Sequence, residues 1–378
     1  MDERENFLLQ KYPAVIDLEK RAKHRIPKVA WEYLQSGTGK ETALKRNTTA
    51  FDKLYLNPRF FKGEIIPKIE TTLFGKTYSA PFGIAPVGIQ GLMWPGGEFS
   101  LATTAKEKNI PYCLSTVASQ NPESVGPFVG SNGWFQLYPP RSKSVRQDLL
   151  KRIKQSGFHT LIVTADVPAP SIRERTKRAG LRTPPRITPA FVWDGITNPA
   201  WTMKFIKHGM PKLKTILPYA AKQSVFEELR AGFGGTLSWE YLAELREEWQ
   251  GTLLVKGITH PEDAINSVES GVDGIIVSNH GGRQFDGVPA AIDLLPPIVN
   301  AVGKNTTIFF DSGVRTGLDI LKAMHLGADF VFLGRAFMYG ICALGDRGGN
   351  HVYNILKQDL LMNMHQLGIQ NLGELRNQ

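Results

Sequence analysis

Eight short apolar runs, each ending in polar or glycine residues, are the sequence feature that most limits the fold. They lie at 81–86, 111–115, 133–138, 160–166, 252–257, 273–282, 307–313 and 329–335. Most are followed by helical periodicity, seen best at 98–109, 144–157, 261–271 and 317–329. Nearly continuous apolar strands that alternate with helices are typical of a parallel sheet covered on both faces. Eight such units predict an α/β fold of the closed (β/α)₈ barrel type.

One connection in this pattern is far longer than the others. A barrel of this type typically needs ~250 residues, and the chain has 378. We predict a single domain over 1–378 with a helical lead-in at the N-terminus and a long loop inserted at 168–235, after the fourth strand. Loops longer than ~15 residues are usually functional. Because this one starts at the rim where barrel active sites lie, we expect a lid.

The net charge of +10 is concentrated in that insertion. Between Arg173 and Lys214 there are ten Lys or Arg residues and two acidic ones. Such a basic segment suits nucleic acid, a membrane or an anionic ligand. We expect no nucleic-acid partner, because the charge lies mainly in one insertion without a recognised binding fold.

Other global features narrow the class of protein. The chain has neither an N-terminal signal-peptide pattern nor a run of ~18 apolar residues, so we expect a cytoplasmic location. Two cysteines, Cys113 and Cys342, are too few for a disulfide framework or a cysteine-based metal site. We therefore expect two buried thiols and no metal.

Polar residues stand where the apolar runs end. In a (β/α)₈ barrel, this end of the strands carries the active site. A single such residue is more often a structural cap, but ten chemically active ones together favour a catalytic rim. They are Ser115, Gln136, Tyr138, Thr164, Asp166, Lys256, Ser278, His280, Asp311 and Arg335.

The strongest local motif is SNHGGRQ at 278–284. It places His280 three residues before Arg283, and thus a base beside a fixed cation. That combination suits an anionic substrate that must lose a proton. The two glycines after the histidine let a ligand approach the backbone.

A second motif indicates a phosphate group. Asp311-Ser-Gly-Val-Arg315 and, after the next strand, Gly334-Arg335 follow strands seven and eight, where barrels often bind phosphate. Exposed glycine N–H groups and arginine forks suit phosphate oxygens. No G-x-G-x-x-G motif opens a strand–helix unit, and Gly39-Lys40 is followed by Glu41, so neither a Rossmann nor a P-loop site is expected.

Together these motifs identify a family resemblance. From about Tyr12 to Leu375 the chain resembles the FMN-dependent 2-hydroxy acid oxidase and dehydrogenase family, which includes glycolate oxidase, lactate oxidase and mandelate dehydrogenase. The resemblance is carried by SNHGGRQ, VKG, FDSGVR, LGR, FQLY and TAD in barrel order. It implies FMN as cofactor, oxidation of an L-2-hydroxy acid to the 2-oxo acid, oxygen or a quinone as electron acceptor, and a homotetramer.

The resemblance also implies roles at the substrate. His280 would take the substrate's proton, and Asp166 would pair with the resulting imidazolium and orient it. Tyr138 would donate a hydrogen bond to the substrate hydroxyl. The substrate carboxylate would be held by Arg173, Arg283 and Tyr33.

Further roles concern the cofactor. Lys256 would lie at the N1–O2 edge of the flavin and stabilise its anionic reduced ring. Asp311 would bind the ribityl chain. The isoalloxazine would be contacted by Pro86, Val87, Gly88, Ser115, Gln136, Thr164 and Ser278. The phosphate would be held by Gly313, Arg315, Gly334 and Arg335.

One departure from the family bears on the substrate. Val117 stands where glycolate oxidase carries a tryptophan that narrows its pocket. The smaller residue implies a substrate that is lactate-like or larger, so lactate, mandelate and longer 2-hydroxy acids stay open.

The electron acceptor also stays open at this point. The segment at 197–213 resembles the insertion of a membrane-associated mandelate dehydrogenase that reduces quinone, whereas VKGITHPEDA resembles soluble lactate oxidase. The alternatives are a lid over a soluble oxidase, a respiratory dehydrogenase docked on the inner face of the membrane, and a peptide-modifying member of the family. Basic residues interleaved with aromatic and aliphatic ones are typical of an interface with anionic lipid. We expect residues 201–217 to form an amphipathic segment whose apolar face has no internal partner.

Overall fold

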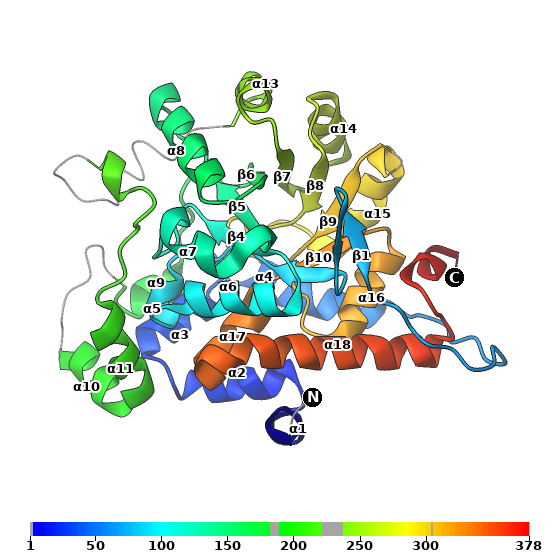
Figure 1. Ribbon diagram of the computed structural model, residues 1–378, viewed down its shortest axis with the longest axis horizontal. Coiled ribbons are helices and arrows are strands. Elements are labelled where there is room, and N and C mark those ends of the chain that lie inside the picture. Colours follow the sequence, from blue (N-terminus) through cyan, green and yellow to red (C-terminus); the bar gives the residue numbers. More distant parts are fainter. Residues whose placement is uncertain (1–2, 182–188, 221–236, 304, 378) are drawn as a thin grey trace.

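The computed structural model describes residues 3–181, 189–220, 237–303 and 305–377, and its centre is a closed parallel barrel (Figure 1). Neighbouring strands follow the chain order, and the last strand pairs with the first. The eight apolar runs of the sequence all form strands of this barrel, so the predicted (β/α)₈ fold is confirmed. The strands are β3 (Phe82–Ile84), β4 (Tyr112–Ser115), β5 (Gly133–Leu137), β6 (Thr160–Thr164), β7 (Thr252–Ile258), β8 (Gly274–Val277), β9 (Thr307–Phe310) and β10 (Phe330–Leu333).

Helices surround the barrel, and the four periodic stretches of the sequence are among them. The helices that follow the strands are α5 (Gln90–Met93), α6 (Gly97–Lys108), α7 (Pro122–Val129), α8 (Lys143–Gln155), α13 (Trp239–Glu248), α14 (Pro261–Glu269), α15 (Ala291–Val302), α16 (Gly317–His325) and α17 (Arg335–Leu344). The long α18 (Gly348–Leu367) closes the chain with η4 (Gly345–Arg347) and η5 (Leu372–Asn377).

The barrel interior is apolar and is closed at the amino end of its strands. Trp134, Phe309, Phe330 and Phe332 fill it, together with smaller side chains. A two-stranded antiparallel hairpin, β1 (Thr71–Leu73) and β2 (Lys76–Tyr78), packs its Leu73 and Tyr78 into the same cluster. Because this end is plugged, ligands have access from the carboxyl end of the strands.

Strand register brings the polar strand ends together at that carboxyl end. Ser115 of β4 pairs with Gln136 of β5, and Thr164 of β6 pairs with Lys256 of β7. A register shift between Lys256 and Ile258 follows in the β7–β8 pairing.

The predicted helical lead-in consists of α1 (Glu3–Lys11), α2 (Val15–Lys23), α3 (Lys28–Gln35), α4 (Thr42–Thr49) and η1 (Ala50–Lys53). Figure 1 shows α2, α17 and α18 side by side below the barrel, and α2 and α18 both contact α17. This packing fixes the start of α3, which carries Tyr33 to the mouth of the barrel.

The long connection between β6 and β7 is mostly helical where it is described. It contains α9 (Glu174–Arg178), α10 (Pro189–Thr197), α11 (Pro199–His208) and η3 (Leu217–Tyr219). Residues 182–188 and 221–236 of the insertion lie outside the described residues.

The expectation that residues 201–217 lack an internal partner is wrong. Trp201, Leu213 and Ile216 are buried in the main core. The Trp201 indole N–H donates to the backbone oxygen of Leu92 at 3.2 Å. A sequence pattern shows that a segment is amphipathic but does not show which partner its apolar side finds, and here Trp201 finds α5, the short helix after β3. Other apolar side chains stay exposed: Met203, Ile206 and Leu217 within this segment, and Val192, Trp193 and Ile196 on α10.

Candidate active site

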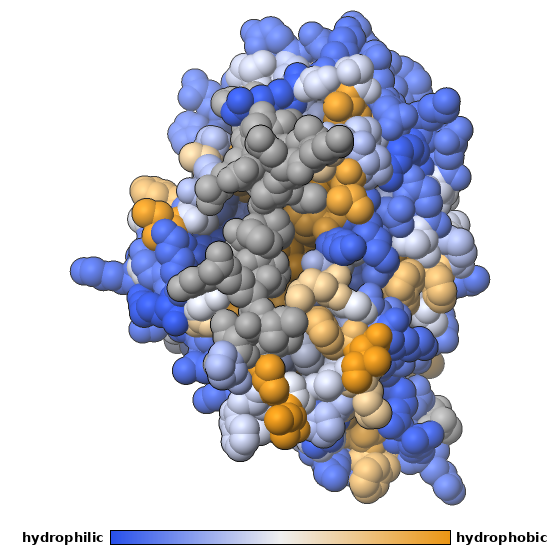
Figure 2. Space-filling model, turned by 90° about the vertical axis from the view of Figure 1, so that its left-hand side faces the viewer, coloured by the Kyte–Doolittle hydropathy of each residue, from blue (hydrophilic) through white to orange (hydrophobic). Residues whose placement is uncertain are grey.

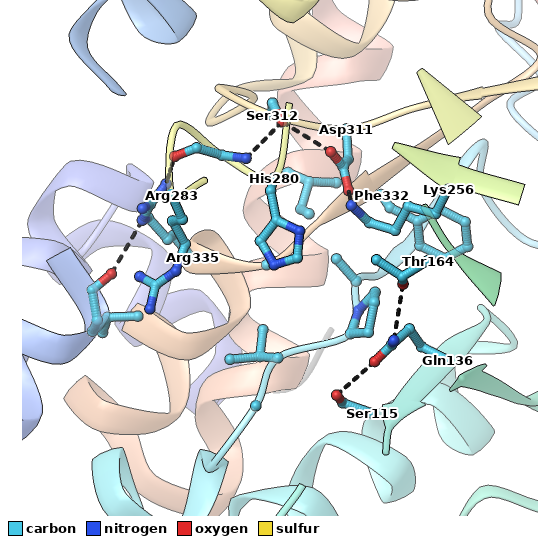
Figure 3. Close-up of a pocket in the computed structure, with 18 of the residues that line it drawn as sticks. Ser115, Gln136, Thr164, Lys256, His280, Arg283, Asp311, Ser312, Phe332 and Arg335 are labelled. Carbon is cyan, nitrogen blue, oxygen red and sulfur yellow. Dashed lines mark hydrogen bonds and ion pairs between the residues drawn. The ribbon is translucent and has the colours of Figure 1, made fainter. Parts of the chain in front are cut away.

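A pocket opens at the carboxyl end of the barrel, where the predicted rim residues meet (Figure 3). Asp166 and Ser278 lie directly behind its wall, in contact with His280 and Lys256 respectively. The predicted site residues that line the pocket itself are Tyr33, Pro86, Val87, Gly88, Ser115, Gln136, Tyr138, Thr164, Arg173, Lys256, His280, Arg283, Asp311, Gly313, Arg315, Gly334 and Arg335.

His280 is held on a tight turn after β8. Its backbone is left-handed, with φ of 58°, and Gly281 and Gly282 continue the turn with φ of 64° and 73°. The His280 N–H donates to Ser278 Oγ at 3.0 Å. A left-handed histidine is uncommon, and such strained residues cluster at functional sites.

A carboxylate stands behind this histidine. Asp166 Oδ1, just after β6, lies 2.8 Å from His280 Nδ1. Burial lowers the pKa of His280 below its ordinary value, although Asp166 acts in the opposite direction. Burial by itself would raise the pKa of Asp166, but His280 and Lys256 outweigh it and hold that pKa below its ordinary value. The pair therefore presents a neutral imidazole, backed by a carboxylate, whose Nε2 is available as a base.

A second charged pair, Lys256 and Asp311, lies on the side of His280 opposite to Arg283 and Arg335 in Figure 3. Lys256 Nζ lies 3.1 Å from Asp311 Oδ2 and donates to Ser278 Oγ at 2.7 Å. Burial alone would lower the pKa of Lys256, but Asp311 and Asp166 outweigh burial and raise it. Lys256 is thus a fixed, buried cation at the floor of the pocket.

Uncharged polar side chains line the pocket next to Lys256. Ser115 Oγ donates to Gln136 Oε1 at 2.7 Å, and Gln136 Nε2 donates to Thr164 Oγ1 at 2.9 Å. This chain crosses three neighbouring strands and fixes the orientation of each side chain. It presents a row of donors and acceptors suited to the edge of a planar heterocycle.

Arginines dominate the opposite side of the pocket. Arg283 donates to the carbonyl oxygens of Tyr33 and Ser36, at 3.0 and 2.9 Å. Arg335 donates to the carbonyls of Leu34, Ser36 and Gly281, each at 3.1 Å. No carboxylate of the described residues forms an ion pair with either guanidinium.

The burial of these two cations lowers their pKa values. Burial, with the charge of Arg173, lowers the pKa of Arg283 to about 9. Burial also lowers the pKa of Arg335 to about 10, and Arg315 and Arg173 act in the same direction. Arginine keeps its proton in proteins, so both groups stay as buried cations with no carboxylate partner among the described residues. The pocket is therefore built to take up anions.

The backbone adds to the anion site at the start of α17. Gly334 is the N-cap of this ten-residue helix, and no side chain of the described residues caps it. By contrast, the preceding α16 is capped by its own Thr316 and Asp319. An uncapped helix N-terminus beside Arg335 and Arg315 suits a phosphate group. Together with the polar row and Lys256, this donor set fits FMN.

Two tyrosines complete the pocket. Burial, with the charge of Asp166, raises the pKa of Tyr138 to about 12, so this phenol stays protonated and can donate. Tyr33 donates from its hydroxyl to the Gly88 carbonyl at 3.3 Å. Its ring lies 5.0 Å from the guanidinium carbon of Arg283. Arg173 lies at the start of α9 and reaches Gln284 Oε1 at 3.4 Å.

Two positions at the site, Ser312 and Ser36, were not predicted from the sequence. Ser312, left-handed with φ of 89°, accepts a hydrogen bond from Gly281 N and donates to Asp311 Oδ1, so it joins the two motif loops. The carbonyl of Ser36 anchors both buried arginines. Ser312 stood inside a recognised motif and could have been found, but a carbonyl acceptor leaves no signal in sequence.

Comparisons with known proteins agree with this site. The FMN-dependent dehydrogenase family matches residues 22–378. An L-lactate dehydrogenase of Pectobacterium atrosepticum is 36% identical over 367 residues, covering 96% of this chain and 95% of that protein. An L-lactate dehydrogenase of Pseudomonas aeruginosa is also 36% identical, with 96% of each chain covered.

Solved structures give the same result. The monotopic membrane protein (S)-mandelate dehydrogenase superposes with a TM-score of 0.90 at 33% identity, covering 96% of this chain and 97% of that one. A mandelate oxidase gives a TM-score of 0.81 at 30% identity, with 97% of each chain covered. A match over nearly the whole chain, with the same barrel and a pocket that fits the cofactor, shows that this chain belongs to the FMN-dependent dehydrogenase family and uses FMN.

Proposed function

We propose that the enzyme oxidises an L-2-hydroxy acid to the 2-oxo acid. The observation that carries this proposal is that His280, with Asp166 behind it, lines one pocket with Arg173 and Arg283, two arginines that have no carboxylate partner among the described residues. A base beside cations selects a substrate that carries both a proton to be removed and a negative charge. A carboxylate next to a secondary hydroxyl has this arrangement.

Each side chain at the substrate has its own role. Arg173, Arg283 and Tyr33 bind the substrate carboxylate, which fixes the hydroxyl-bearing carbon beside the base. Tyr138 donates a hydrogen bond to the substrate oxygen. His280 Nε2 takes the proton, and Asp166 stabilises the positive imidazolium, as carboxylates do behind catalytic histidines.

FMN, when bound, supplies the two-electron acceptor. Arg315, Arg335 and the α17 N-terminus would hold its phosphate, and Asp311 would hold its ribityl chain. Lys256 would provide a positive charge beside the ring, and Ser115, Gln136, Thr164 and Ser278 would orient that ring with the 86–88 backbone. The similar proteins include an L-lactate dehydrogenase and an (S)-mandelate dehydrogenase, and these names support a substrate of lactate size or larger.

The test is anaerobic reduction of the purified enzyme. L-2-hydroxy acids should bleach the flavin absorbance, whereas their D-enantiomers and their amides should not. His280→Gln should keep the flavin bound and slow its reduction by about 10²–10⁴-fold, the usual contribution of a positioned base. Rapid bleaching of the His280→Gln enzyme would remove this residue from the mechanism.

We also propose that the enzyme is a dehydrogenase that docks on the inner face of the cytoplasmic membrane and reduces quinone. On α10 and α11 five apolar side chains are at least half exposed: Val192 50%, Trp193 65%, Ile196 68%, Met203 67% and Ile206 78%. Figure 2 looks onto this side of the molecule and shows hydrophobic residues in the lower part of the face, where Figure 1 places these helices. Contiguous apolar patches of this kind mark membrane or protein contacts.

Two findings support a monotopic contact. The solved neighbour with the TM-score of 0.90 is a monotopic membrane protein. Within the described ranges, no helix has the length and apolar character needed to cross a bilayer. Lys207 lies on the same helix as the exposed Met203 and Ile206 and suits an anionic surface, whereas Lys204 is paired with Asp346 at 2.7 Å.

Vesicle co-sedimentation tests the docking. The intact enzyme should sediment with anionic vesicles, less so at high salt, and the double variant Trp193→Ser, Ile206→Ser should stay in the supernatant. Met362→Ser, which removes an exposed apolar side chain (53% exposed) from α18, is the matched control. Deletion of the whole insertion is a poorer test, because Trp201, Leu213 and Ile216 belong to the core. Re-oxidation of the reduced enzyme by a quinone faster than by oxygen would support the dehydrogenase, and the reverse order the oxidase.

The family resemblance also supports a homotetramer as part of this proposal. Light scattering of the purified holoenzyme would test it, since a monomeric mass contradicts the assignment.

A further inference from the structure

A second cleft lies away from the flavin pocket, between the α2–α3 turn and α10. Its volume is about 370 Å³, within the ~300–1,000 Å³ typical of small-molecule sites. None of its lining residues is shared with the flavin pocket. We propose that this cleft binds the headgroup of a phosphatidylethanolamine-type lipid. The proposal rests on the membrane docking proposed above and goes beyond it, because it assigns a lipid class and a site.

The cleft carries charges of both signs. Lys23 at the end of α2, His24 just after it and Lys28 at the start of α3 line it, and their side chains are exposed. Glu32 and Asp194 line it as well, one from α3 and one from α10. Glu32 also lies 3.6 Å from Arg175, from its Oε2 to the Arg175 Nη1, so Asp194 is the acid that would most strongly repel a lone phosphate or carboxylate. A ligand that joins a phosphate to a primary ammonium can satisfy both sets of charges.

Asp194 is the group that discriminates between ammonium types. Its Oδ2 accepts a hydrogen bond from the backbone N–H of Lys28 at 3.0 Å, which ties α10 to the start of α3. Its Oδ1 accepts no hydrogen bond from the described residues. A primary ammonium can donate to this oxygen, whereas the quaternary ammonium of phosphatidylcholine has no N–H to donate.

The surroundings of the cleft point to a lipid and not to a free zwitterion. Asp194 stands in α10 between Trp193 and Ile196, which are 65% and 68% exposed. Both are among the residues proposed to enter the apolar layer. A headgroup in the cleft would therefore leave its acyl chains beside exposed apolar side chains, and a small soluble ligand would gain nothing from them.

The experiment compares three kinds of vesicle with the full-length holoenzyme: phosphatidylcholine alone, and phosphatidylcholine mixed with phosphatidylethanolamine or with phosphatidylglycerol. Binding to the ethanolamine vesicles should exceed binding to phosphatidylcholine about three- to fivefold, as expected for one partly exposed ion pair. It should persist at about 1 M salt, where the Debye length is about 3 Å and attraction to phosphatidylglycerol is screened. Soluble phosphoethanolamine should compete with the ethanolamine vesicles.

Asp194→Asn is the specific variant. The amide keeps the size of the side chain and an oxygen that can accept from Lys28 N–H, but it removes the negative charge. It should bind ethanolamine and choline vesicles equally while flavin reduction is unchanged. Asp293→Asn, which removes an exposed carboxylate from α15, is the matched control and should keep the preference.

The outcomes separate this inference from the docking proposal. If the wild type binds all vesicles alike, or if Asp194→Asn keeps the ethanolamine preference, the headgroup site is wrong and the docking stands. If the wild type binds none of the vesicles, the docking itself is wrong and the headgroup site falls with it.

Discussion

A methyl group on Gly257 would lie 2.5 Å from Cβ of Asp166, closer than real Cβ atoms approach one another. Gly257 has φ of 101° and coincides with the register shift between β7 and β8. The absence of a side chain at this position is what lets the carboxylate of Asp166 stand behind His280. The glycine of the VKG motif therefore gives Asp166 the space for its position beside His280.

Replacing this glycine should disturb catalysis more than cofactor binding. Gly257→Ala must push Asp166 away from His280, and a displacement of about 1 Å can cost about 10²-fold in rate. We expect kcat to fall by about that factor while the purified protein stays yellow. Stopped-flow flavin reduction and the flavin-to-protein absorbance ratio measure the two effects.

The control for backbone strain is Gly157→Ala. Gly157 has φ of 85°, and a Cβ placed there would meet nothing within 4 Å. It should lose stability without losing rate. A Gly257→Ala enzyme with normal kcat would show that Asp166 does not need its present position.

The negative charge of Asp166 should affect the pH dependence of kcat/KM. The pKa of His280 lies below its ordinary value, so the neutral base persists as pH falls and activity declines only as pH drops through that lowered pKa. Asp166 acts to raise the pKa of His280. In Asp166→Asn the acid limb of the kcat/KM profile should therefore move to lower pH. The plateau should drop as well, because the imidazolium loses its counter-charge.

Flavin reduction rates between pH 5 and 9 would show both changes. An acid limb that moves to higher pH in Asp166→Asn would contradict the proposed electrostatic role. His325→Gln, which changes a histidine on α16 that binds the Leu375 carbonyl, should leave the profile unchanged.

The two substrate arginines should differ in their tolerance of lysine. Arg283 is fixed by two carbonyls, whereas Arg173 is held more loosely, by Ser171 and Gln284 at 3.2 and 3.4 Å. Arg283→Lys loses both the anchored fork and its geometry, so we expect kcat/KM for the acid to fall about 10- to 100-fold. Arg173→Lys should raise KM with a smaller effect on kcat. Steady-state kinetics on an acid and its amide, measured side by side, test this, and equal losses on both would refute carboxylate binding.

The strands and the site were predictable from sequence for different reasons. Buried parallel strands must be apolar along their whole length, so runs such as TLIVT identify β6 without any tertiary knowledge. Because strand ends converge at one mouth, Asp166, Lys256 and His280 could be placed together from chain order alone. The family resemblance was needed to give them roles.

Contacts between backbone segments that are distant in the chain could not be predicted from the sequence. The steric demand of Asp166 on Gly257 depends on the exact crossing of two strand ends, and the carbonyl of Ser36 has no side-chain signature. The same limit explains the error at 201–217. Trp201 looks like a membrane-facing aromatic in the pattern, but the 3.2 Å hydrogen bond to Leu92 turns it inward.

Val117 should set the size of the accepted substrate. It lines the pocket, and its Cγ2 would lie 2.8 Å from a Cβ on Gly88, so it stands directly over the 86–88 backbone. Val117→Trp should fill the space for a substrate side chain while leaving His280 and the arginines in place. We expect kcat/KM for mandelate to fall about 10- to 100-fold, less for lactate, and little for glycolate, since poor fit in an apolar pocket has costs of this size.

The complementary variant tests the same wall in the opposite direction. Val117→Ala enlarges the pocket and should shift the preference toward longer 2-hydroxy acids, with kcat for lactate nearly unchanged. Both variants should keep a normal flavin spectrum, because the hydrogen bond from Val117 to Ser115 Oγ, at 3.3 Å, is donated by the backbone N–H and does not depend on the side chain. If Val117→Trp lowers kcat/KM equally for glycolate, lactate and mandelate, the residue does not face the substrate side chain, and the size of the natural substrate must be set by another wall, such as Leu34 or Met93.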